Sequence, residues 1–255
     1  MGILYIVASP IGNLKDITLR AIEVLQNAQI IACEDTRHTG TLLKQFQISN
    51  NKFQINTNTH TPNLLSYYEQ NEMQRIPEII ALLKNDNNVA LVSDAGTPTI
   101  SDPGFKLVRE CIKEGIRVES IPGPNAAVSA LVSSGLPTDK FFFVGYLPHK
   151  PGHRKDAIKN IAAVLGIIKT TIIIYEAPHK IMKTLSDVLE VLGDIEIVLC
   201  RELTKMHEEI RREKISQSLA HFEKVVPKGE FVILFNNVIL ANAGIQTLDS
   251  RSGRE

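Results

Sequence analysis

Short apolar runs recur along the chain, and each is followed by a stretch in which apolar positions repeat every three to four residues. Such runs are typical of buried strands, and such repeats are typical of helices with one apolar face. In the first half they predict strands at 3–8, 30–33, 89–92 and 117–121, and helices at 16–27, 38–46, 77–84, 105–114 and 125–134. This alternation predicts an α/β fold with a mostly parallel sheet covered by helices.

The alternation breaks at residues 135–139, a stretch rich in Gly, Pro and polar residues. We therefore expect two α/β domains, 1–137 with a mostly parallel sheet and 138–236 with a smaller, mixed sheet. The second domain is predicted to hold strands at 141–144, 170–175, 195–200 and 230–235 and helices at 156–165 and 181–192. Residues 237–255 end in a polar stretch and are expected to form a disordered tail.

Composition favours a soluble protein with a substantial core, since 44% of the 255 residues are hydrophobic and 22% are charged. Because the formal net charge is zero, any nucleic-acid contact must come from local patches. No apolar run could span a bilayer and the start of the chain lacks a basic leader, so no membrane partner is expected. Cys33, Cys111 and Cys200 fit neither a metal site nor a disulfide framework, which favours a cytoplasmic location.

Several common catalytic motifs are absent from the sequence. No Gly-x-Gly-x-x-Gly follows the first strand, and there is no Walker A or Gly-x-Ser-x-Gly sequence. The segment from His207 to Arg211 begins like a zinc motif, but Arg211 occupies the position of the second His. These absences argue against dinucleotide binding and against nucleotide, serine or zinc hydrolysis, and no metal is expected.

Turn-forming and polar clusters follow four predicted strands of the first domain, at residues 8–14, 34–39, 93–104 and 122–127. The carboxyl ends of parallel strands meet at one edge of a sheet, where open α/β folds bind ligands. Ala95 and Gly96 carry almost no side chain, so a ligand can lie against their backbone. Taken singly, each cluster is equally consistent with an ordinary turn.

Further clusters follow strands of the second domain, at residues 145–148, 175–180, 201–205 and 228–230. In their order and number, all these clusters resemble the tetrapyrrole methylase superfamily. Within it they resemble the 16S rRNA (cytidine 2′-O-ribose) methyltransferases that modify the decoding region. The resemblance runs from about residue 3 to residue 235. It implies a class III methyltransferase fold, with S-adenosylmethionine bound in a cleft between two α/β domains.

The same resemblance implies the partners and the cofactor residues. The partners are 16S rRNA in the small ribosomal subunit and a second copy of the chain, as a homodimer, with no role for DNA. A sulfonium nucleoside needs backbone polar groups, small residues and apolar walls. The residues assigned to this role are Pro10, Asp94, Ala95, Gly96, Thr97, Ile100, Asn125, Ala126, Tyr175 and Glu176.

The catalytic candidates lie in the cluster at residues 34–38, namely Glu34, Asp35, Arg37 and His38. A ribose hydroxyl is a weak nucleophile, so a carboxylate or His38 is expected to take its proton. Arg37 is expected to clamp a phosphate of the RNA. The alternative is structural, with Asp35 capping the following helix and Arg37 paired with Glu34.

Two basic runs are candidates for further RNA contact. The first contains Lys150, Arg154 and Lys155, and the second contains Arg201 and Lys205. The alternative is a solvated, charged face, especially for the second run, which glutamates interleave. Members of this family commonly continue past the equivalent of Phe235 into a basic helical segment. Here a short polar stretch stands in that place, which bears on RNA affinity rather than on the cofactor pocket.

Two other functions stay open at this point. One is methylation of a small molecule such as a corrin or porphyrin precursor. The other is an inactive methylase fold that binds ribosomal subunits without transferring a methyl group. The clusters at 34–39 and 201–205 match the rRNA branch, and the intact Pro10, Gly96 and 122–124 positions weigh against loss of activity.

Overall fold

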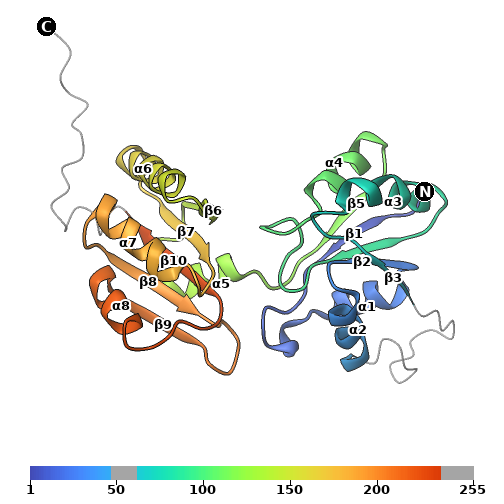
Figure 1. The fold of residues 1–255 in the computed structure, drawn as a ribbon. Coiled ribbons are helices and arrows are strands. Elements are labelled where there is room, and N and C mark those ends of the chain that lie inside the picture. Colours follow the sequence, from blue (N-terminus) through green and yellow to red (C-terminus); the bar gives the residue numbers. More distant parts are fainter. Residues whose placement is uncertain (47–61, 237–255) are drawn as a thin grey trace, which may run out of the picture. The chain divides into compact units, whose positions relative to one another are not determined.

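The computed structural model describes residues 1–46 and 62–236. The chain divides into two compact units, Met1–Asn125 and Ala126–Glu255, each built on one five-stranded sheet with helices (Figure 1). The tail predicted at 237–255 lies outside the described residues.

The sheet of the first unit is entirely parallel, with strand order β3-β2-β4-β1-β5. The mostly parallel sheet expected from the sequence is therefore confirmed. Its strands are β1 (Leu4–Val7), β2 (Ile30–Cys33), β3 (Asn63–Ser66), β4 (Val89–Val92) and β5 (Val118–Ile121). The sequence pattern did not predict β3, because this edge strand has no buried residue and hence no apolar run.

Helices cover both faces of this sheet. They are α1 (Leu19–Asn27), α2 (Thr36–Gln45), α3 (Glu72–Lys84) and α4 (Phe105–Lys113), with a 3-10 turn, η1, at Leu14–Asp16. Successive strand residues point to opposite faces, so Leu4 and Ile6 of β1 pack with α3 and α4, whereas Val7 packs with α1 and α2. The neighbouring strands β1 and β4 thus send the helices that follow them to opposite faces. That arrangement creates a topological switch point at their carboxyl ends.

The second unit contains the predicted mixed sheet, with strand order β6-β7-β10-β8-β9. Only β6 and β7 run parallel. The strands are β6 (Phe141–Tyr146), β7 (Thr171–Glu176), β8 (Glu196–Arg201), β9 (Glu209–Lys214) and β10 (Phe231–Asn236). The sequence did not predict β9, because five of its six residues are charged. This edge strand pairs with β8, and the Arg201–Glu209 ion pair joins the two strands.

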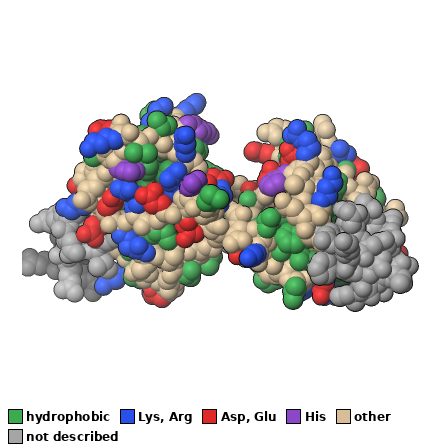
Figure 2. All heavy atoms as spheres, turned by 90° about the horizontal axis from the view of Figure 1, so that it is seen from below, with side chains coloured by type: hydrophobic (Ala, Val, Ile, Leu, Met, Phe, Trp, Pro, Cys, Tyr) green, Lys and Arg blue, Asp and Glu red, His purple; other side chains and the backbone are tan. Residues whose placement is uncertain are grey.

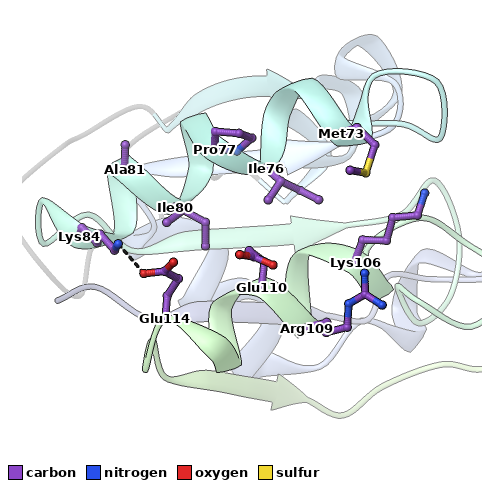
Figure 3. Close-up of a pocket in the computed structure, with 10 residues that line it drawn as sticks. All are labelled: Met73, Ile76, Pro77, Ile80, Ala81, Lys84, Lys106, Arg109, Glu110 and Glu114. Atoms are coloured by element: carbon purple, nitrogen blue, oxygen red, sulfur yellow. Dashed lines mark hydrogen bonds and ion pairs between the residues drawn. The ribbon is translucent and has the colours of Figure 1, made fainter.

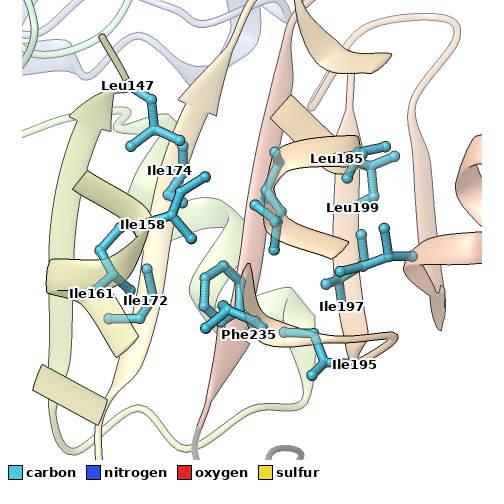
Figure 4. Close-up of a cluster of buried hydrophobic side chains, with 14 of the residues drawn as sticks. Leu147, Ile158, Ile161, Ile172, Ile174, Leu185, Ile195, Ile197, Leu199 and Phe235 are labelled. Carbon is cyan, nitrogen blue, oxygen red and sulfur yellow. The ribbon is translucent and has the colours of Figure 1, made fainter. Parts of the chain in front are cut away.

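The main core of the second unit lies between its sheet and three helices, α6 (Pro151–Ile167), α7 (Ile181–Leu192) and α8 (Ile215–Phe222). Figure 4 shows Ile158 and Ile161 of α6 meeting Ile172 and Ile174 of β7 in this core. A fourth helix, α5 (Ala126–Ser134), packs against β7, β8 and β10. The sequence pattern predicted α5, at 125–134, but missed α8.

The boundary between the units differs from the expected one at residue 137, because α5 belongs to the second unit. Its buried residues, which include Ala127, Ala130 and Leu131, lie in a helix that packs on the second sheet. This packing joins residues far apart in the sequence, and no local pattern signals it.

The three cysteines are free and buried. Burial raises the pKa of the Cys111 and Cys200 thiols to about 12, so both are neutral and unreactive at physiological pH. Among residues 1–46 and 62–236, no helix is long and apolar enough to cross a membrane.

Candidate active site

The loops that follow β1 and β4 are joined at the switch point. Ser9 N–H donates to Gly96 O at 2.8 Å, and Gly96 N–H donates to Ser9 O at 3.1 Å. The Ser9 hydroxyl also donates to Ser93 O at 3.1 Å. Gly96 has φ +81°, a conformation that favours glycine, and an added Cβ would lie 3.3 Å from a methyl group of Ile11.

The loop after β5 joins the same edge. The Thr97 hydroxyl donates to Pro124 O at 2.9 Å. A Cβ added to Gly123 would lie 2.8 Å from the Ala8 Cβ, so only glycine allows this close approach. The structure thus brings together three of the loops assigned to the cofactor, and places Pro10 among the buried residues and Ala95 and Ile100 at the surface.

Glu34 follows β2 at the same edge of the sheet. Among the described residues, its buried Oε1 has no hydrogen-bond partner. Burial, followed by the negative charges of Asp102 and Asp94, raises the pKa of Glu34 to about 7. A hydrogen bond from the Asp94 backbone to the Glu34 carboxylate lowers the pKa, but by less. A carboxyl group with this pKa is suited to accept and release a proton at neutral pH.

Asp35 caps α2, as the structural alternative proposed. It accepts the Arg37 N–H at 2.8 Å and two hydrogen bonds from the Arg37 guanidinium, at 3.1 and 2.8 Å. Arg37 therefore pairs with Asp35 and not with Glu34. Hydrogen bonds from Arg37 hold the pKa of Asp35 well below its usual range, which makes Asp35 a poor proton acceptor. The Arg37 side chain is 90% exposed and accessible to an anion.

Asp94 connects the ends of β2 and β4. Its Oδ1 accepts the Asp35 N–H at 3.3 Å and lies 3.6 Å from His38 Nδ1. The structure thus brings Glu34, Asp35 and His38 together with Asp94, which the sequence assigned to the cofactor. No three Asp, Glu, His or Cys side chains in the described part of the chain are arranged to hold a metal ion.

Two of the predicted cofactor residues end β7 in the second unit. The Tyr175 hydroxyl accepts the Ala127 N–H at 2.9 Å, so the start of α5, with Ala126, is tied to β7. The Glu176 side chain is buried and accepts hydrogen bonds from the Ala177 N–H and the Thr184 hydroxyl. The protein's own donors therefore engage both oxygens of Glu176, and this carboxylate orders the turn between β7 and α7.

The first basic run is exposed only in part, since Lys150 is exposed but Arg154 is buried. Arg154 is only 4% exposed, and its Nε donates to Asp187 Oδ2 at 2.6 Å. Its guanidinium also donates to His149 O at 3.2 Å. Lys155 is paired with Glu190 at 2.7 Å. The predicted RNA contact of Arg154 is therefore corrected, because a buried guanidinium bonded on both sides cannot reach a phosphate.

The second basic run is largely neutralised by its own glutamates. Arg201 Nε donates to Lys228 O at 2.7 Å, and Lys205 Nζ pairs with Glu202 at 2.9 Å and with Glu230 at 2.8 Å. These contacts fit the alternative of a charged face better than RNA binding. On the face drawn in Figure 2, Lys and Arg side chains likewise alternate with Asp and Glu.

Sequence reasoning missed Glu72, which supports the loop between β4 and α4. This carboxylate is 4% exposed and accepts hydrogen bonds from the Tyr67 hydroxyl at 2.8 Å and from the Gly104 N–H at 3.2 Å. It also pairs with Lys106 at 2.9 Å. Burial raises the pKa of Glu72, but the donors from Lys106, Tyr67 and Gly104 outweigh it and lower the pKa overall. No local motif marks this residue, because two of its partners, Gly104 and Lys106, lie on a segment remote from it in the sequence.

A groove of about 550 Å³ lies between α3 and α4. Figure 3 shows Ile76, Pro77 and Ile80 of α3 along one side and Glu110 and Arg109 of α4 along the other. None of the predicted site residues lines this groove. A smaller pocket of about 250 Å³ lies at the end of the β4–α4 loop and includes Glu72 and Asp102.

The fold has counterparts among solved methyltransferase structures. A diphthine synthase superposes with a TM-score of 0.68 at 14% identity, covering 92% of this chain and 90% of that one. The uroporphyrin-III-C-methyltransferase of Thermus thermophilus superposes with a TM-score of 0.59 at 20% identity, covering 95% and 98%. At these identities the likeness concerns the fold, which is that of a class III methyltransferase.

The model of the tetrapyrrole (corrin/porphyrin) methylases matches residues 3–218, and the chain belongs to this family of methyltransferases. Its curated relatives include proteins named Ribosomal RNA small subunit methyltransferase I. The one from Thermotoga maritima is 43% identical over 236 residues, 92% of this chain and 99% of that protein. The one from Escherichia coli O157:H7 is 45% identical over 236 residues, 91% of this chain and 77% of that protein.

Proposed function

We propose that this chain is an S-adenosylmethionine-dependent methyltransferase that methylates the ribose 2′-oxygen of a cytidine in the decoding region of 16S rRNA. The assignment to small-subunit rRNA is supported by relatives of that name, which match more than nine-tenths of the chain at 43–46% identity. The observation that carries the proposal is the Ser9–Gly96 junction, which orders the loops assigned to the cofactor.

The residues around this junction fit the cofactor. Gly96 in its left-handed conformation and the exposed Ala95 present backbone groups, while Ile100 adds apolar surface that is 38% exposed. A nucleoside bearing a sulfonium and an amino acid needs these polar and apolar contacts together. S-adenosylmethionine, when bound, supplies a methyl group activated for in-line transfer.

The chain's own contribution to the chemistry is alignment and proton removal. As the ribose oxygen takes up the methyl group that the bound cofactor would supply, the hydroxyl proton goes to Glu34. Glu34 fits this role because its Oε1 has no partner among the described residues and its pKa is raised to about 7. The Arg37 guanidinium holds a phosphate of the RNA in this proposal, which its 90% exposed side chain supports.

The proposal includes a cytoplasmic setting, where ribosomal subunits are made, and a homodimer in solution. It is tested by incubating the purified chain with labelled S-adenosylmethionine and small subunits that lack ribose methylation in the decoding region. Label on a cytidine 2′-oxygen is the expected result. Cofactor binding without transfer to the subunits would instead favour a small-molecule substrate, and absence of cofactor binding would favour an inactive scaffold.

A further inference from the structure

Six Lys and His side chains gather at the carboxyl ends of β6 and β7 in the second unit. We call them the basic surface: His149, Lys150, His153, His179, Lys180 and Lys183. Five of them are exposed, and Lys180 is partly exposed. Within residues 1–46 and 62–236, no carboxylate lies within ion-pair distance of any of the six, unlike Arg154, Lys155 and Lys159 nearby. The three lysines of this surface therefore carry positive charge that no carboxylate in the described part of the chain neutralises.

The parallel pairing of β6 and β7 brings these residues together. Tyr146 is aligned with Tyr175, so the loops that follow the two strands leave the sheet side by side. Figure 4 shows the two strands running in the same direction. Where the loops meet, His149 Nε2 lies 3.2 Å from Lys180 Nζ. Neither loop contains a carboxylate that would neutralise the charge of the Lys180 ammonium.

The helices that follow add to the positive potential. α6 and α7 pack against each other, and both begin at this edge of the sheet. Neither has an acidic residue in its first turn, and neither Lys150 nor Lys180 caps its helix with a side-chain hydrogen bond. The positive ends of both helix dipoles thus reinforce the charge of the side chains.

The buried Arg154 fixes the geometry of this surface from below. It bonds to Asp187 of α7 and to the carbonyl oxygen of His149, and so ties the β6–α6 loop to the neighbouring helix. The backbone of the loop that carries His149 and Lys150 is therefore held in place before an anion binds, which limits the conformational entropy lost on binding.

We propose that the basic surface binds the phosphodiester backbone of the RNA substrate, chiefly through Lys180 and Lys183. This inference rests on the proposed function and names the surface that recognises its substrate. Tyr146, which is 52% exposed, ends β6 and packs edge-to-face on Tyr175, with ring centroids 5.8 Å apart. Cations and an exposed aromatic ring at one edge of a sheet favour single-stranded RNA over an acidic protein surface.

The test compares two double variants of the full chain. Lys180→Ala/Lys183→Ala removes two cations of the basic surface. Lys140→Ala/Lys169→Ala removes two exposed lysines next to the amino ends of β6 and β7, at the opposite edge of the same sheet, and is the matched control. Affinity is measured by fluorescence anisotropy with a transcribed 16S rRNA fragment that spans the decoding region, over a series of salt concentrations.

The basic-surface variant is expected to bind this fragment at least tenfold more weakly at about 100 mM salt, with a salt slope smaller by roughly 1.4 for two lost phosphate contacts. The control is expected to stay within twofold of wild type, and both variants to keep wild-type cofactor affinity. Equal losses in the two variants, or no loss in either, would overturn the proposal. A loss seen with whole subunits but not with the naked fragment would also overturn it, because the partner would then be a ribosomal protein.

Binding and methyl transfer are scored separately, which distinguishes this inference from the proposed function. A wild-type chain that binds the fragment through the basic surface but transfers no methyl group overturns the proposed function alone. A wild-type chain that methylates subunits while the basic-surface variant binds and methylates equally well overturns this inference alone.

Discussion

Ser9 and Gly96 exchange two backbone hydrogen bonds, of 2.8 and 3.1 Å, across the point where β1 and β4 send their helices to opposite faces of the sheet. The pairing holds the β4–α4 loop in a strained form, with Thr99 and Ser101 also at positive φ. Strain of this kind persists only where the surroundings fix it, and it is concentrated at functional sites.

Replacing Gly96 by Ala tests this junction. The substitution places a Cβ at φ +81° and 3.3 Å from Ile11, so we expect a loss of about 1–2 kcal/mol in unfolding free energy and at least tenfold weaker cofactor binding. Gly135→Ala is the control, since Gly135 has φ +82° and no atom within 4 Å of an added Cβ. Calorimetric titration with S-adenosylmethionine should show weaker binding for Gly96→Ala than for Gly135→Ala. Similar affinities in both variants would count against a cofactor contact at Gly96.

The raised pKa of Glu34 predicts how activity and stability depend on pH. Methyl transfer should rise as pH increases through about 7, because Glu34 must be ionised to take the ribose proton. Glu34→Gln should lower kcat by about 10²- to 10⁴-fold. The control is Glu23→Gln, an exposed position on α1. A wild-type rate that does not change between pH 6 and 8, or an active Glu34→Gln variant, would remove Glu34 from the mechanism.

The same pKa shift has a consequence for folding. The folded chain keeps a proton on Glu34 up to about pH 7, whereas the unfolded chain releases it near the ordinary value of 4.5. A raised carboxyl pKa therefore makes the folded state less stable as pH rises through this window. Glu34→Gln abolishes that loss, so its melting temperature should exceed that of the wild type by more at pH 8 than at pH 5.

Glu72→Ala should affect both stability and the cofactor. The substitution leaves the buried Tyr67 hydroxyl and Gly104 N–H without their acceptor, which costs about 1–3 kcal/mol. Because Gly104 ends the β4–α4 loop, cofactor affinity should fall several-fold as well. Lys106→Met removes the half-exposed cation but leaves Glu72 its hydrogen bonds from Tyr67 and Gly104, so it should cost less than Glu72→Ala. Equal effects of the two substitutions, in urea unfolding and in cofactor titration, would show that the loop does not depend on Glu72.

Arg154→Ala should destabilise the chain by about 3–5 kcal/mol, since it leaves the buried Asp187 carboxylate only the more distant Lys155, at 3.9 Å. Lys155→Ala breaks a more exposed pair with Glu190 and should cost less than about 1 kcal/mol. Denaturant unfolding of the two variants checks this difference. An Arg154→Ala variant as stable as wild type but deficient in RNA binding would restore the original assignment of Arg154 to the RNA.

The hydrophobic pattern of the sequence was sufficient to predict much of the fold. The apolar runs of β1, β2 and β4 are buried on both faces, so every residue contributes to the signal. The pattern failed for β3 and β9, whose residues are partly exposed and paired only at a sheet edge. It also misplaced the boundary at α5, because the preference of that helix for the second sheet is a long-range contact.

The candidate site, too, has features that can be predicted from the sequence and features that only the structure reveals. Turn-forming clusters after parallel strands can be recognised in the sequence, because their φ angles demand glycine and their strands end at one edge. The partners of the charged side chains cannot be recognised there. Arg154 and Lys180 differ little as basic residues, yet one is buried against Asp187 and the other has no carboxylate partner in the described part of the chain.

The sequence by itself therefore determined the class of fold, the order of most strands and helices, and the loops at the carboxyl ends of the first sheet. These depend on periodicity and turn chemistry, which act over a few residues. Only the tertiary structure decided that Glu34 lies beside Asp94 and Asp102, that Glu72 holds Gly104, and that Lys180 meets His149. Electrostatic interactions and burial depend on distances in space, and those are set by which strands pair and in which direction.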